Sequence, residues 1–290
     1  MEEHQEYQQP QDMVFFSPDM LKWADQRRRR KEEYLQDCER AASDGDGVAQ
    51  VQMGLRYLYG TDGVERDADK AFYWFSQTEP DNPIGQYWLA VCYDGGVGVE
   101  RNIEQATQLF HESAEKDYPP ALCDLGVCYE HGSGVEKDMD KAIALYRRSA
   151  EAGYAMGQCN LGALLYYGVG VERNVEEAAQ LFTLAAEQQL PRAQFFLGLC
   201  YEFGNGVEMD VNKAVLLYRE ASKSKFAEGT CALGVMYHAG KGVERDDEKA
   251  FALFKEASEH AITCACAERY YHYTETAAII NHFRREFTDC

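Results

Sequence analysis

The chain has 290 residues, of which 46% are hydrophobic, and this is enough to build a sizeable core. Its formal net charge of −20 repels nucleic acids and anionic membrane surfaces, so a protein or peptide partner with a basic segment is a better candidate. No apolar run approaches the ~18 residues of a membrane span, and the acidic start lacks a secretory signal pattern, so we expect a cytoplasmic protein.

The N-terminal region divides into two expected parts. Residues 1–22 are polar and glutamine-rich at their start, which predicts a disordered tail. Residues 23–46 predict a single helix that caps the N-terminal end of the fold. This helix contains the basic run Arg27–Lys31, which could act as a nuclear localisation signal. A solvated helix face beside an acidic body is the simpler interpretation of that run.

From residue 47 onward one pattern recurs every 36 residues. Each copy carries two glycines, a valine and a glutamate in fixed order after an apolar stretch, as in "YEHGSGVEKD" at 129–138. A fixed period of this length is typical of solenoid proteins. The first copy has one extra loop residue. The six copies occupy 47–82, 83–118, 119–154, 155–190, 191–226 and 227–262.

Each copy predicts two helices joined by a short loop. In the third copy Ala121, Leu125 and Tyr129 follow the i, i+4, i+8 spacing of one apolar helix face. Gly132 can take a positive φ and end that helix, and Asp138 is a good N-cap for the next one. One such hairpin cannot bury its apolar face alone, whereas six stacked in order can. The sequence therefore predicts an all-α fold, a right-handed α-solenoid.

The third copy, "ALCDLGVCYEHGSGVEKDMDKAIALYRRSAEAG" at 121–153, resembles a Sel1-like repeat, which is related to the tetratricopeptide repeat. The resemblance recurs in all six copies. It is weaker at Ala90, at Leu165 and in "SQTEPDNP" at 76–83, where we expect local irregularity. Similar proteins act in signalling, complex assembly and host–microbe contact, so the resemblance implies a non-enzymatic adaptor. Residues 263–290 predict closing helices that cap the last repeat.

The cysteines of the repeats lie at two recurring positions of the first helices. A secreted, cysteine-rich branch of the resembled family joins the two helices of each hairpin by a disulfide. No second helix of this chain carries a cysteine, so we expect buried, reduced thiols that pack as small apolar residues. The residues are Cys92, Cys128 and Cys200 at one position, and Cys123, Cys159 and Cys231 at the other.

Two other groups of residues suggest chemistry only weakly. The spacing of His260, Cys264, Cys266 and His272 fits no common zinc site, so we expect no metal and no cofactor. Cys128 and His131 could form a thiolate–imidazole pair, but nothing in the sequence supplies an orienting group or an oxyanion hole. We therefore expect no catalytic residue.

A serine–lysine pattern gives the alternative function. Ser113 with Lys116, and Ser222 with Lys225, match the S-x-x-K trace of serine β-lactamases. Some Sel1-repeat relatives have been linked to penicillin binding, so the alternative is a β-lactam-binding or β-lactam-hydrolysing enzyme. The partner motifs S-D-N and K-T-G are absent, and the trace is common by chance.

A glutamate follows the loop valine in every copy. These glutamates could line a track for a cation or a basic peptide. We favour a structural role instead, in which each one pairs with a basic residue of the adjoining repeat or caps backbone amides. The residues are Glu65, Glu100, Glu136, Glu172, Glu208 and Glu244.

The first helices of related solenoids line the concave face, where ligands usually bind. Two recurring positions of these helices give an expected groove that is acidic and has aromatic anchors at Trp88, Tyr166 and Phe196. Such a groove suits an extended peptide that carries lysine or arginine. We therefore predict a monomeric adaptor for a basic segment. The groove residues are Trp88, Asp94, Asp124, Glu130, Asn160, Tyr166, Phe196, Glu202 and His238.

Overall fold

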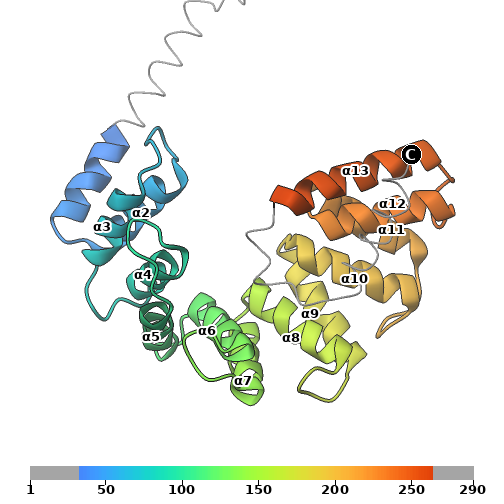
Figure 1. Cartoon of the computed structure of the whole chain (residues 1–290), viewed down its shortest axis with the longest axis horizontal. Helices are drawn as coiled ribbons and strands as arrows, with labels where there is room; N and C mark the ends of the chain where they lie inside the picture. The colour runs from blue at the N-terminus through green and yellow to red at the C-terminus, as the bar shows by residue number, and fades with distance from the viewer. Residues whose placement is uncertain (1–32, 264–290) are drawn as a thin grey trace, which may run out of the picture.

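The computed structural model describes residues 33–263, and within this range the regular structure is entirely helical. Residues 33–43 form a helix, and six helix pairs come after it (Figure 1). The first helices of the pairs are α2 (Gly47–Tyr59), α4 (Pro83–Gly95), α6 (Pro119–His131), α8 (Ala155–Tyr167), α10 (Pro191–Phe203) and α12 (Ala227–Ala239). The second helices are α3 (Ala68–Ser76), α5 (Ile103–Ala114), α7 (Met139–Glu151), α9 (Val175–Glu187), α11 (Val211–Lys223) and α13 (Asp247–Thr263).

The hinge between the two helices of a pair has the predicted construction. Gly132 ends α6 with a φ of +74°, and its N–H donates to the carbonyl of Cys128. The side chain of Asp138 accepts the N–H of Lys141 at the start of α7. The backbone N–H of Asp138 also donates to the carbonyl of Tyr129 at 2.9 Å, which closes the loop. The equivalent left-handed glycines are Gly60, Gly96, Gly168, Gly204 and Gly240.

A lysine–tyrosine contact supports the hinge in four repeats. In the third, the Lys141 ammonium lies 5.0 Å from the centre of the Tyr129 ring, within the range of a cation–π interaction. In the fourth repeat these two positions hold Glu177 and Leu165. The fourth repeat therefore lacks both members of this contact, the tyrosine at Leu165 and the lysine at Glu177. The other pairs are Lys70–Tyr57, Lys213–Tyr201 and Lys249–Tyr237.

The helix pairs stack in chain order, and the substantial packing joins helices of the same or adjacent repeats. This is the neighbour-only contact pattern of a solenoid, so the predicted fold class is confirmed. The stack bends into an open arch (Figure 1). In its N-terminal half α2, α4 and α6 lie on the inner side of the arch, and α3, α5 and α7 lie on the outer side.

The N-terminal end of the stack is covered by the helix at 33–43. Its Cys38 and Ala42 are buried and pack with Ala49, Met53 and Trp74 of the first repeat. Residues 1–22, the Arg27–Lys31 run and the segment after Thr263 lie outside the described residues. Within 33–263, no helix combines the length and apolar character needed to cross a bilayer.

Candidate functional site

The acidic residues of the expected groove are held by groups of the protein itself. The Tyr146 hydroxyl donates to the Glu130 carboxylate at 2.7 Å, and Tyr218 donates to Glu202 at the same distance two repeats later. Glu202 also accepts from the Lys241 ammonium at 3.0 Å, and its side chain is only 11% exposed. These tyrosines come from the second helices, α7 and α11.

Asp94 of α4 and Asp124 of α6 form an acidic pair, because the charge of Asp94 acts on the Asp124 carboxyl. Asp124 keeps part of its surface exposed, and the Tyr87 hydroxyl donates to it at 3.1 Å. Burial raises the pKa of the Asp124 carboxyl to about 6, and the charge of Asp94 adds to the rise. The Asp94 side chain is 40% exposed and lies 3.8 Å from the Arg101 guanidinium.

The three expected aromatic anchors differ in their surroundings. Phe196 is buried and stacked on Phe182, with the ring centres 4.9 Å apart, so it belongs to the core and was wrongly expected to be a groove anchor. Trp88 is partly buried and stacked on Phe75. Tyr166 is also partly buried.

His238 lies in α12, near the C-terminal end of the described stack. Its Nδ1 lies 2.8 Å from Asp247 Oδ1 of α13, and both side chains are about half exposed. The structure therefore brings together three pairs of expected residues. These are Asp94 with Asp124, Glu130 with Asn160, and Tyr166 with Phe196, whose ring centres are 6.4 Å apart.

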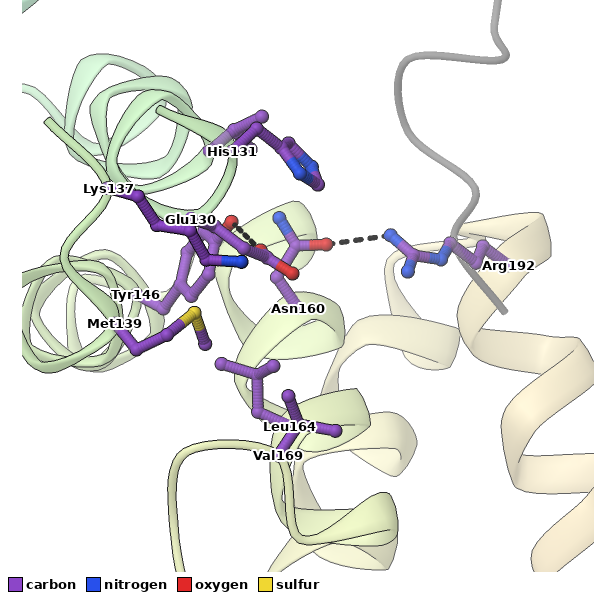
Figure 2. Close-up of a pocket in the computed structure, with 10 residues that line it drawn as sticks. Glu130, His131, Lys137, Met139, Tyr146, Asn160, Leu164, Val169 and Arg192 are labelled. Carbon is purple, nitrogen blue, oxygen red and sulfur yellow. Dashed lines mark hydrogen bonds between the residues drawn. The ribbon is translucent and has the colours of Figure 1, made fainter. Parts of the chain in front are cut away.

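Glu130 and Asn160 line a pocket of about 280 Å³ between the third, fourth and fifth repeats (Figure 2). One wall is apolar and the other carries charged and amide groups. Asn160 Oδ1 accepts a hydrogen bond from the Arg192 guanidinium at 2.7 Å. This bond orients the Arg192 side chain at one edge of the pocket. The lining residues are Val127, Glu130, His131, Lys137, Met139, Tyr146, Asn160, Leu164, Val169 and Arg192.

The sequence analysis missed the basic residues of this pocket. The row of residues equivalent to Lys137 holds arginine in four other repeats and Met209 in the fifth repeat. Two of the arginines, Arg101 and Arg173, donate Nε to a carbonyl of their own first helix. The lysine in that row was a usable signal, because a lysine has no Nε–H to reproduce that bond. Arg192 was a second signal, since the same position in the other five repeats holds no basic residue.

The cysteines within 33–263 are reduced and buried, as expected. Burial raises the pKa of the Cys92 and Cys200 thiols to about 12 and that of Cys128 to about 11. Cys128 lies 3.8 Å from the Thr107 hydroxyl of the preceding repeat. A nucleophilic cysteine needs a lowered pKa, so this thiol does not suit the pairing with His131 considered above.

The two serines of the S-x-x-K trace are used in packing. The Ser113 hydroxyl is fully buried and donates to the carbonyl of Pro83 at 2.6 Å. The Lys116 ammonium donates instead to the carbonyl of Asp81. Ser222 accepts from the Thr230 hydroxyl at 3.1 Å. Ser113 therefore lacks the exposed hydroxyl and the lysine base that acyl transfer requires.

The loop glutamates do not form the ion pairs that we favoured for them within residues 33–263. All six are exposed, and none takes part in the ion pairs found between residues 33 and 263. No group of three or more potential metal ligands occurs in the described part of the chain. The candidate zinc residues at 264, 266 and 272 lie outside it.

Comparisons with known proteins show a match to one family. The family model of the Sel1 repeat matches six stretches of the chain. They are 47–78, 83–118, 119–154, 155–190, 191–226 and 227–261.

Two solved structures resemble the chain over most of its length. A protective antigen of uropathogenic Escherichia coli that displays an SLR fold is 31% identical, with a TM-score of 0.62 over 78% of this chain and 48% of the antigen. A Sel1 repeat protein from Oxalobacter formigenes is 32% identical, with a TM-score of 0.62 over 72% of this chain and 82% of that one.

A curated plant relative matches a shorter stretch. It is the ERAD-associated E3 ubiquitin-protein ligase component HRD3B of Arabidopsis thaliana, which is 36% identical over 93 residues. The match spans 32% of this chain and only 14% of the plant protein.

Proposed function

This chain belongs to the Sel1-repeat family, and we propose that it is a non-enzymatic scaffold that holds an extended, basic segment of a partner protein on its inner surface. Sel1-repeat proteins generally mediate protein–protein interaction. The plant relative is a component of a ubiquitin ligase, and membership of such an assembly fits the same kind of role. The β-lactam alternative has less support, because the Ser113 hydroxyl is buried and bonded to a backbone carbonyl.

The observation that carries the proposal is the acidic pair Asp94 and Asp124. Asp94 comes from α4 and Asp124 from α6, and the pKa of Asp124 is raised by burial and by the charge of Asp94. A lysine or arginine side chain bound between them would offset this repulsion. Tyr87, Trp88 and Tyr118 form a cluster of rings at the same place, with adjacent ring centres 5.2 and 5.4 Å apart. Aromatic groups beside carboxylates suit the stem and head of a basic side chain.

A peptide selection tests this proposal. The full chain is immobilised and presented with a library of random dodecapeptides fused through their C-termini to a phage coat protein. We expect the wild-type protein to enrich peptides that contain lysine or arginine. The double variant Asp94→Asn/Asp124→Asn should lose that enrichment and keep its helical circular dichroism spectrum.

The matched control is Glu136→Gln/Glu172→Gln, which removes the same charge from two exposed loops. This control should select the same basic peptides as the wild type. Failure of the wild-type chain to enrich any peptide would contradict the scaffold proposal. Equal loss of basic peptides in the control would show that the overall negative charge of the chain, rather than the acidic pair, selects them.

A further inference from the structure

The pocket between the third and fifth repeats has a positive lining in a strongly acidic chain. Lys137 and Arg192 are its permanent cations, and Glu130 is its one carboxylate. The lining thus has two positive charges and one negative charge without His131, and Arg192 also lies near the Glu228 carboxyl of the sixth repeat, whose pKa burial raises. The formal charge of the whole chain is −20, so positively charged pockets are few. This pocket favours an anionic ligand, whereas the acidic pair favours a cationic one.

The polar groups of the pocket are held in place by the fold. The Glu130 carboxylate accepts from the hydroxyl of Tyr146, which lies beside it in the lining of the pocket (Figure 2). The Arg192 guanidinium donates to Asn160 and lies 5.6 Å from the centre of the Phe196 ring. A guanidinium oriented on two sides loses little conformational freedom when it binds an anion.

A repeat position explains why the pocket is present here and not two repeats later. The residue between the two loop glycines reaches back to the first helix of the preceding repeat. Lys241 reaches Glu202 in this way, and Asn205 donates to the Tyr166 hydroxyl at 2.8 Å. Val169 stands at the same position opposite Glu130 and has no polar group to place there. It contributes an apolar wall to the pocket instead.

The apolar wall narrows the choice of ligand. The side chains of Met139, Leu164 and Val169 lie together below the charged groups (Figure 2). They suit a short aliphatic stem, while Lys137 and Arg192 suit the anionic head that it carries. Two cations beside the Glu130 carboxylate suit a monoanion such as a carboxylate better than a phosphate dianion, which would meet the charge of Glu130 and lie near Glu228.

We propose that this pocket binds the side-chain carboxylate of a glutamate in the same partner segment whose basic residue is held by Asp94 and Asp124. The inference rests on the proposed function and adds a second, oppositely charged contact to it. Such a segment is bound in one direction only, because its basic end lies over repeats two and three and its glutamate lies farther along the stack. The partner is therefore recognised by the order of its charges.

The same peptide selection tests the inference with different variants. We expect wild-type selections to enrich glutamate at a constant spacing from the basic residue. Lys137→Gln/Arg192→Gln should lose the glutamate and retain the basic residue. Asp94→Asn/Asp124→Asn should lose the basic residue and retain the glutamate. The matched control Arg147→Gln/Lys223→Gln, which removes two exposed cations from α7 and α11, should select the wild-type pattern.

Synthetic peptides then identify the source of the carboxylate. A selected peptide with both ends capped should lose about tenfold or more in affinity when its glutamate becomes glutamine, as expected for a charge-assisted hydrogen bond. A glutamine peptide with a free C-terminus that binds as well as the capped glutamate peptide would overturn the side-chain assignment. Selection of basic peptides without any acidic preference would overturn this inference alone, and failure to select peptides would overturn the proposed function as well.

Discussion

Asp124 is a residue whose surroundings favour its protonated form. Its folded pKa of about 6 lies above the ordinary value of 3.8, mainly because burial desolvates the carboxylate. Between these two pH values the folded chain holds a proton that the unfolded chain releases. The stability contribution of Asp124 therefore falls as the pH rises through this window, and the full penalty is present above pH 6. Ionising the Asp124 carboxyl therefore lowers the stability of the free protein, and Asp124 is one of the two acids that we propose to bind a cation.

Asp124→Asn is expected to stabilise the free protein at neutral pH. An asparagine carries no charge and keeps a carbonyl oxygen that can accept from the Tyr87 hydroxyl. We expect a gain of about 1–2 kcal/mol at pH 7.5, which is less than the full linkage value because Asp124 is partly exposed. The gain should shrink toward pH 4. Urea unfolding at pH 4.5, 6 and 7.5 measures it, with Glu136→Gln as the control, and a gain that is constant with pH would refute this account.

The acids of the inner surface also show how far the sequence could predict the site. The 36-residue period placed Glu130 and Glu202 on the first helices correctly, because period and helix face are backbone properties. It did not predict that Tyr146 and Tyr218 would reach across from the second helices to bond them. Such contacts depend on how two helices pack, and repeat spacing within one helix does not contain that information.

At the scale of the element, the loop within each pair also joins one repeat to the next. The second loop glycine of the fifth repeat, Gly206, has a φ of +73° and lies directly against the carbonyl of Val175 at the start of α9. A side chain there would meet both backbone strain and a neighbouring repeat. The period predicted the turn at this glycine, but the close approach to the preceding repeat was not predicted.

Gly206→Ala is therefore expected to destabilise the chain by about 2–4 kcal/mol, as the sum of left-handed strain and a clash with Val175. Gly63 offers a matched control, because it occupies the equivalent position in the first repeat. Its φ is +86° and no atom lies within 4 Å of an added Cβ. Gly63→Ala should lose only about 1–2 kcal/mol. Thermal and urea unfolding compare the two variants, and equal losses would argue against the contact between repeats.

At the scale of the whole molecule, the packing between neighbouring repeats is not equally extensive along the arch. One continuous buried cluster extends from Cys123 to Ala250, whereas the first repeat is divided between two smaller clusters. α3 has nine residues, compared with thirteen in α7, and its packing on α4 is the sparsest between successive helices. The irregular "SQTEPDNP" stretch at 76–83 lies at this junction. In a neighbour-coupled array, a weak junction allows the end to open alone.

We therefore expect the first repeat to open before the rest of the stack. In hydrogen exchange followed by mass spectrometry, amides of α2 and α3 should exchange about tenfold faster or more than those of α8 to α11, because their opening exposes fewer buried contacts. Gly206→Ala provides an internal comparison. It should speed exchange in α9 and α10, on the two sides of the weakened contact, and leave α2 and α3 unchanged. Uniform exchange across all the repeats in the wild type would mean that the arch unfolds as one cooperative unit, and that the acidic pair and the basic pocket are held by a single rigid body.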